Sequence, residues 1–426
     1  MAALAIDVVT LYVARSEIQR AADAAALAAA KAIADSGVTS LQATDPNLLA
    51  AQTLAQNMAT AAVTAMVNVS STINLVDGKP PTLVTLTPIP IDFTRQGNPH
   101  VTIQLNSTNL PTFFSKIWGG SPASATATAT AEVYNPANLP TFTPIAPLSL
   151  KPWLVANADP NNATAAFVNI TTGAVEESVT GEQLNLIADC KIAPPDKCVL
   201  RNAHNPPKAN PPFEVDYVPL QVSSPPNSKN VCPGASAYCA AGPSDYEASI
   251  ECADATTYVT PTCGGGATNA VWSDAFNPRG IAGPSAAATE CLIHAGGPGP
   301  WDGSTNFQDT LTIPGWPASA PQIMAETGPQ TGNLVTTSSS IVTIPIIDTS
   351  MPAGSFPASP GAVIVVGYIQ GFINQINPNP GPTPPPGDIN VTVLNIAGCS
   401  ATPNAANPIV GGSGTSPIPV RLITPP

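Results

Sequence analysis

The sequence predicts an α+β protein: a long N-terminal α-helix packed on a small β-sheet, followed by a β-rich, loop-rich region stapled by disulfides. Three observations predict this class. Residues 1–37 form an apolar, alanine-rich run without proline. Several later stretches alternate between apolar and polar residues, as strands with one buried face do. Eight cysteines and 50 prolines mark a loop-rich remainder, because proline favours turns and edge strands over long helices.

The N-terminal run is predicted to be one continuous helix over residues 2–35. Its apolar residues recur at spacings of three and four, which places them on one helical face. These residues are Ile18, Ala22, Ala25, Ala29 and Ile33. Gly37 suits the left-handed turn that ends a helix. The sequence therefore predicts an apolar head, residues 1–14, followed by an alanine-faced shaft from Arg15 to the end of the helix.

A helix of this length, about 50 Å, is too long for a small domain to cover completely. Alanine lets a neighbouring backbone approach closely, which suits a partner helix. Residues 1–14 are almost wholly apolar, with Asp7 as the one charge, but this head is shorter than the roughly 20 residues that cross a bilayer. On the residues alone, an anchor or assembly element and a buried core helix both remain open.

The chain up to residue 134 is predicted to complete an α+β module around this helix. A second helix is expected over about residues 47–67, with Asp45 as its N-cap. Strands are predicted over 72–76, 82–91, 100–105 and 123–133, with a short helix over 112–117. The last strand alternates alanine with serine and threonine, so the long helix can lie close across it.

The remainder is predicted to form a second domain. Residues 135–147 read as a linker, and residues 148–426 as a β-rich domain with a cysteine-rich insertion at 189–299. The disulfide candidates are Cys190, Cys198, Cys232, Cys239, Cys252, Cys263, Cys291 and Cys399. Their spacings are not those of a zinc site, and eight cysteines allow 105 pairings, so no connectivity is assigned. Free buried thiols are the alternative.

Two stretches resemble a known family. Residues 4–32, LAIDVVTLYVARSEIQRAADAAALAAAKA, and residues 110–133, LPTFFSKIWGGSPASATATATAEV, stand in the order found in TadE/TadG-like proteins of the Tad (Flp) pilus-assembly system. The resemblance covers mainly residues 1–135. It implies a pilin-like helix on a sheet, a body outside the cytoplasm, and further apolar residues ahead of Asp7, so that residues 1–37 read as a truncated membrane anchor.

The resemblance also implies a function: a non-enzymatic cell-envelope protein that is anchored or packed through its N-terminal helix. The residues expected to carry packing or assembly are Leu4, Asp7, Tyr12, Ile18, Ala22, Ala25 and Ala29. Because a carboxylate is costly in lipid, Asp7 is expected to contact an amine or a basic residue of a partner. Expected partners are other pilus or envelope proteins, the membrane if the true N-terminus is longer, and a second copy of the chain.

Two other functions remain open: a structural subunit of an extracellular filament, and a secreted binding module or hydrolase built on the disulfide region. Catalytic motifs are absent from the sequence, and its three histidines, His100, His204 and His294, lie far apart. Asp348 and Ser350 half-fit a metal motif in which Pro352 supplies no ligand. No catalytic residue, cofactor or metal is therefore predicted. A net charge of −13 argues against nucleic acid as a partner.

Overall fold

The computed structural model divides the chain into two compact units. Unit 1 comprises residues 1–134, 318–320 and 420–426, and unit 2 comprises residues 135–317 and 321–419. The structure describes residues 2–35, 47–69, 83–84, 99–110, 114, 117, 119, 123–133, 150–162, 165–171, 173, 175, 179, 181–188, 191–193, 197–199, 212–220, 244–251, 270–272, 282–293, 309–312, 322–325, 340–348, 356–357, 361–377, 388–399 and 418–423.

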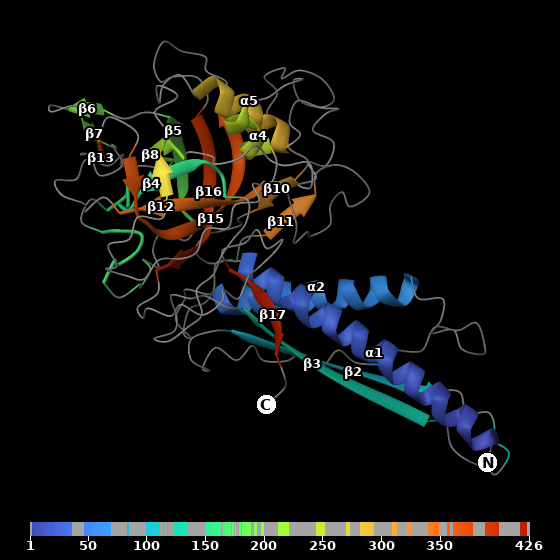
Figure 1. The fold of residues 1–426 in the computed structure, drawn as a ribbon. Coiled ribbons are helices and arrows are strands. Elements are labelled where there is room, and N and C mark those ends of the chain that lie inside the picture. The colour runs from blue at the N-terminus through green and yellow to red at the C-terminus, as the bar shows by residue number, and fades with distance from the viewer. Residues whose placement is uncertain are drawn as a thin grey trace. The chain divides into compact units, whose positions relative to one another are not determined.

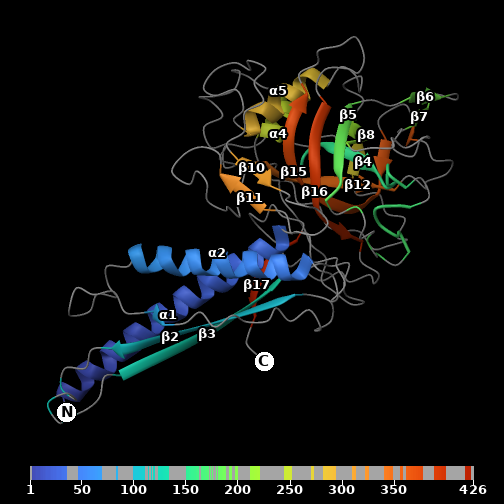
Figure 2. The same cartoon turned by 180° about the vertical axis from the view of Figure 1, so that it is seen from behind.

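Unit 1 is a two-helix layer on an antiparallel sheet. Its helices are α1 (Ala2–Asp35) and α2 (Asn47–Val69). Its strands β1 (Leu83–Val84), β2 (His100–Leu110), β3 (Ala123–Val133) and β17 (Val420–Ile423) follow the order β1-β2-β3-β17. Figures 1 and 2 show α1 between α2 and the long strands β2 and β3. The predicted N-terminal helix is confirmed.

Alanine allows α1 to be covered on two sides. On β3 the alanines at alternate positions face the helix layer, and Ala127, Ala129 and Ala131 are buried. On α1, nine residues from Ala21 to Ala34 are at most 3% exposed, and at about 100° per residue they span more than half of the helix circumference. Methyl side chains let a sheet and a second helix both approach the same helix closely. The second half of α1 is therefore the core of unit 1.

The C-terminal strand belongs to unit 1, although it lies within residues 148–426, which were predicted to form one domain. β17 pairs antiparallel with β3, and Arg421 lies opposite Glu132. The Arg421 guanidinium donates from Nε to Glu132 Oε2 over 2.7 Å, and His100 Nε2 lies 3.5 Å from Glu132 Oε1. A mostly buried carboxylate thus joins three strands. This long-range pairing is invisible to local sequence patterns.

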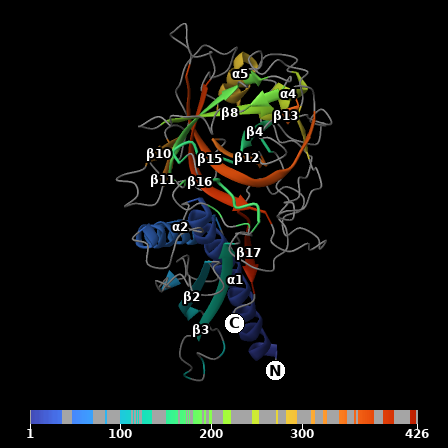
Figure 3. The ribbon, with the colours of Figure 1, turned by 90° about the vertical axis from the view of Figure 1, so that its left-hand side faces the viewer.

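Unit 2 is built on a closed barrel. Its strands are β4 (Trp153–Ala156), β5 (Gln183–Ala188), β8 (Phe213–Pro219), β12 (Ile341–Ile347), β15 (Val365–Asn377) and β16 (Asp388–Gly398). They pair in the order β12-β15-β16-β5-β8-β4, and β4 closes the ring on β12. The β4–β12 and β5–β8 pairs are parallel, and the other four are antiparallel. Figure 3 shows the long strands β15 and β16 curving around the barrel.

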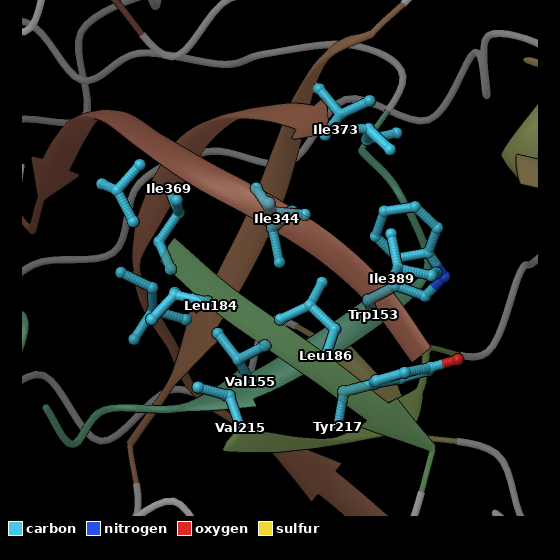
Figure 4. Close-up of a cluster of buried hydrophobic side chains, with 14 of the residues drawn as sticks. Trp153, Val155, Leu184, Leu186, Val215, Tyr217, Ile344, Ile369, Ile373 and Ile389 are labelled. Atoms are coloured by element: carbon cyan, nitrogen blue, oxygen red, sulfur yellow. The ribbon is translucent and has the colours of Figure 1, made fainter. Parts of the chain in front are cut away.

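The barrel interior is a packed apolar core. Figure 4 shows side chains from all six strands pointing toward one another, among them Trp153, Leu184 and Ile344. Two helices, α4 (Asp245–Glu251) and α5 (Ala282–Ile293), contribute Tyr246 and Ala286 to the same cluster. The barrel strands come from segments nearly 250 residues apart in the chain, so the barrel joins distant parts of unit 2 around one core.

Several short strands complete the described part of unit 2. They are β6 (Lys191–Ala193), β7 (Lys197–Val199), β9 (Ala270–Trp272), β10 (Asp309–Thr312), β11 (Gln322–Ala325), β13 (Phe356–Pro357) and β14 (Gly361–Val363). They form the sheets β13-β7-β6, β10-β11 and β14-β9.

Most of the cysteine-rich insertion lies outside the described residues, and so does the predicted strand 72–76. Cys291 in α5 and Cys399 after β16 are both disulfide-bonded. Five of the other candidates, and the side chain of Cys198 in β7, belong to the part of the chain that is not described. The α-helical start and β-rich remainder are confirmed, whereas stapling of residues 189–299 by disulfides stays a prediction.

Candidate functional site

The first half of α1 presents large apolar side chains to solvent. Ile6, Val8, Val9, Tyr12 and Val13 are 50%, 57%, 60%, 76% and 38% exposed. Ile6, Val9 and Val13 are spaced by three and four residues, and Val8 and Tyr12 by four, so the five form one continuous helical face. We call these five residues the apolar stripe. Isolated exposed apolar residues are ordinary, but a contiguous group marks a contact surface.

The stripe exists because only one side of this half of α1 is covered. Asp7 and Ala14 point toward the rest of unit 1 and are 4% exposed each. Farther along the helix α2 and the sheet cover both sides, and the exposed apolar face ends. Arg15 and Arg20 are exposed directly after the stripe. The stripe is thus an apolar surface with a basic border, in a chain whose net charge is −13.

Asp7 makes its contact inside unit 1. Its carboxylate accepts the backbone N–H of Phe114 with distances of 3.3 Å to Oδ1 and 3.1 Å to Oδ2. This contact ties the turn at residues 114–117, where Ile117 N donates to Phe114 O, to the first turns of α1. Gly119 follows with a φ of 76°, which ends that turn. The expected contact of Asp7 with a partner's basic residue stays a prediction.

The shaft residues lie against their own chain. Ile18, Ala22, Ala25 and Ala29 are between 0% and 4% exposed. Gln19 lies beside this face and donates from Nε2 to the backbone carbonyl of Thr128 over 3.1 Å, which links α1 to β3. The alanine face therefore packs within unit 1, and its role in assembly with another protein remains a prediction.

The structure separates the predicted helix residues into three groups. Ile18 and the three alanines are buried, Asp7 is buried and hydrogen-bonded, and Tyr12 is the most exposed large apolar residue of the described chain. Leu4 lies in α1, but its side chain is outside the described part. The sequence-based prediction missed Ile6, Val8, Val9 and Val13 as a group. The signal was present, because residues 1–14 are apolar on every face of the helix rather than on one.

Unit 2 contains a buried group of hydroxyls at the contact between the barrel and its helices. The Tyr246 hydroxyl lies 2.8 Å from Ser285 Oγ, which joins α4 to α5. Burial raises the pKa of Tyr246 and of Tyr217 well above the ordinary tyrosine range, so both phenols stay neutral. Trp153 packs against Tyr217 with ring centroids 6.3 Å apart. These groups are buried, so they are interpreted as contacts that attach the helices to the barrel and not as a binding site for a small molecule.

Two features of the described residues concern chemistry and location. No group of three or more histidine, cysteine, aspartate or glutamate side chains within that part of the chain is arranged to hold a metal ion. No helix there combines the length and the apolar character needed to cross a membrane.

Fold and surface together define an α+β protein with a long helix packed on a sheet, an exposed apolar stripe on that helix, and a separate β-barrel unit. Residues 1–32 match the family model described as Tad, "Putative Flp pilus-assembly TadE/G-like". The match confirms the TadE/TadG-like resemblance for this segment, which contains the whole stripe. For residues 110–133 the resemblance stays a prediction. Neither the curated proteins nor the solved structures gave a match.

Proposed function

We propose that this protein is a non-enzymatic component of Tad (Flp) pilus assembly, and that its apolar stripe is the surface that contacts the assembly. The observation that carries the proposal is the coincidence of two findings. The segment that matches the TadE/G-like model is also the segment that exposes five large apolar side chains. A surface of this kind gains free energy when a partner covers it, at roughly 25 cal/mol per Å² of apolar area removed from water.

The division of α1 into two halves supports this role. The alanine shaft is held by β3, β2 and α2, so it fixes the direction of the helix. The apolar head then projects its stripe while Asp7 and Gln19 hold it on the unit. A rigid helix presents a contact surface at low entropic cost, because few rotamers remain to be ordered on binding. The stripe suits either a partner helix or the apolar layer of the cell envelope.

The second unit is proposed to lie outside the cytoplasm. Its cysteine-rich insertion would be stapled by disulfides there, because disulfides persist in oxidising compartments. Its barrel core is apolar and filled, which suits a structural body. The expectations that the protein has no catalytic site, no cofactor and no nucleic-acid partner are part of this proposal.

The test replaces the wild-type gene by a variant with Val9→Asp and Tyr12→Asp. Both residues are exposed, so the folded chain should tolerate the change, whereas a charged stripe should no longer enter an apolar contact. The number of Flp pili per cell, counted by electron microscopy, should fall at least tenfold. The matched control is Ala61→Asp with Ala65→Asp, two exposed positions on α2, which should leave the count unchanged. Normal piliation of the stripe variant would overturn the proposal.

A structural subunit of the filament is the second candidate function, and the same stripe favours it, because a projecting apolar helix can form the core of a polymer. Copy number separates the two functions. Mass spectrometry of the sheared surface fraction and of the membrane fraction measures where the chain accumulates and which residue is its native N-terminus. Enrichment in the membrane fraction supports an anchored accessory. A processed chain in large excess in the sheared fraction supports a filament subunit.

A further inference from the structure

The outer edge of β3 is paired over only part of its length. β17 covers Thr130–Val133, with Val420 opposite Val133 and Ile423 opposite Thr130. Among the strands that the structure describes, none pairs with residues 123–129 on the side away from β2. Figure 1 shows β17 at one end of β3, with the rest of that strand continuing beyond it.

The backbone groups that face this open edge can be identified. Val133 N donates to Pro99 O over 2.9 Å, so the backbone N–H of Val133 points toward β2. Backbone groups alternate between the two sides of an antiparallel strand, so those of Ser124, Thr126 and Thr128 point outward. The Thr128 carbonyl agrees with this direction, because it accepts a hydrogen bond from the Gln19 side chain instead of from β2.

The open segment lacks the devices that normally protect a strand edge. Residues 123–129 contain neither a charged residue nor a proline. Continuing the register of β17 would set Pro425 opposite Thr128, and proline has no N–H to donate. An exposed edge of this kind is a template for another strand.

We propose that residues 123–129 of β3 are a strand-pairing surface for a second copy of this chain. The sequence Ser-Ala-Thr-Ala-Thr at 124–128 is self-complementary in an antiparallel pair. A twofold axis at Thr126 sets Thr126 opposite its equivalent and Ser124 opposite Thr128, so that hydroxyls meet hydroxyls and methyls meet methyls. Such a pair could make about six backbone hydrogen bonds, two for each outward-facing residue pair; because each Thr128 carbonyl already accepts from Gln19, about four of them form without competing with that contact. The two copies then share one continuous sheet.

A cross-strand threonine pair already exists within unit 1. Thr102 on β2 lies opposite Thr130 on β3, and their Oγ1 atoms are 3.0 Å apart. That pair is a non-hydrogen-bonded one, whereas Thr126 and its equivalent would form a hydrogen-bonded pair; cross-strand threonine pairs of this kind are stabilising. The inference rests on strand geometry alone and does not depend on the proposed function.

The first test is Thr126→Pro in the full chain, with Thr126→Val as its matched control. Proline removes an outward N–H and leaves the hydrogen bonds to β2 intact, because that N–H faces away from β2. Both variants lose the Thr126 hydroxyl, so a difference between them does not come from the lost hydroxyl and reports the missing N–H. Analytical ultracentrifugation should show a monomer–dimer equilibrium whose dissociation constant rises at least about tenfold for proline relative to valine. Hydrogen exchange of α1 checks that unit 1 remains folded.

The second test is Thr126→Cys, which places two thiols across the axis. Residues of a hydrogen-bonded antiparallel pair have Cα atoms about 5.5 Å apart, within the range that a disulfide spans. After mild oxidation this variant should run as a covalent dimer on a non-reducing gel, whereas Ala61→Cys, an exposed position on α2, should not. A monomeric wild type, equal dissociation constants for proline and valine, or equal cross-linking at both cysteines would each overturn the inference.

Discussion

Replacing Ala25 by leucine should destabilise unit 1 by about 2–3 kcal/mol. Ala25 is 0% exposed and lies in the part of α1 that the sheet and α2 cover from two sides. Inserting extra carbons into a packed core typically costs about 1–3 kcal/mol, and the upper part of that range applies where neither side can move away. Leucine and alanine have similar helix propensities, so the loss would report packing rather than helix formation.

The assay is native-state hydrogen exchange of the α1 amides, because the two units need not unfold together. A loss of 2–3 kcal/mol corresponds to exchange that is roughly 30- to 150-fold faster. The matched control is Ala61→Leu, at an exposed position on α2, where exchange of α1 should change less than about twofold. Equal exchange rates in the two variants would refute the two-sided packing of the alanine shaft.

Three further predictions concern the rest of the molecule. Gly371→Ala should destabilise the barrel, because the added Cβ would overlap the side chain of Val391 in β16. Gly283→Ala in α5 should stabilise unit 2 slightly, because its added Cβ meets nothing within 4 Å. Thermal unfolding of unit 2 compares the two variants. Glu132→Gln should release β17 and speed exchange of its amides about tenfold, because the carboxylate that holds its arginine is lost. Burial, followed by the neighbouring Glu247, raises the pKa of Glu251 from 4.5 to about 7. The folded state then holds a proton that the unfolded chain releases, so stability should fall as pH rises from 4.5 to 7, and Glu251→Gln should flatten that slope in urea unfolding.

These predictions separate two functions of one helix. A substitution in the shaft tests folding, because the alanine face is buried within unit 1. A substitution in the stripe tests contact with a partner, because those side chains are exposed in the folded chain. A defect in piliation caused by Ala25→Leu would therefore reflect loss of unit 1. The same defect caused by Val9→Asp with Tyr12→Asp would reflect loss of the surface itself.

Local patterns predicted the two helices of unit 1 and several strands well, but they did not predict α5, which lies in a stretch read as loops and short elements. The predicted helix over 2–35 and strand over 123–133 coincide with α1 and β3, and the second helix differs from α2 by two residues at its end. Each of these elements is determined by spacing within a short window: alanines at three and four in α1, and alternation of small and hydroxyl residues in β3. The strand that begins at His100 extends to Leu110, beyond the predicted end at Leu105, because its pairing with β3 continues through a bulge.

Local sequence patterns predicted the helix that carries the candidate site, but not which of its residues are exposed. The sequence by itself determined that residues 1–32 form an apolar and alanine-rich helix of TadE/G-like type, because helix periodicity and family pattern are written in neighbouring residues. It also determined that Asp7 is the single charge in the apolar head. It did not determine which apolar residues of that head are buried, because all faces of it are apolar.

Only the tertiary structure decided the remaining features. The carboxylate of Asp7 meets an amide 107 residues away, Glu132 meets Arg421 across 289 residues, and the barrel closes strands from both ends of unit 2. Each of these contacts joins segments that are far apart in the chain, and the spacing of residues within a short stretch of sequence carries no information about such contacts. The exposed stripe and the open edge of β3 are what remains uncovered after those long-range pairings have formed, so they too are properties of the fold rather than of any single stretch of sequence.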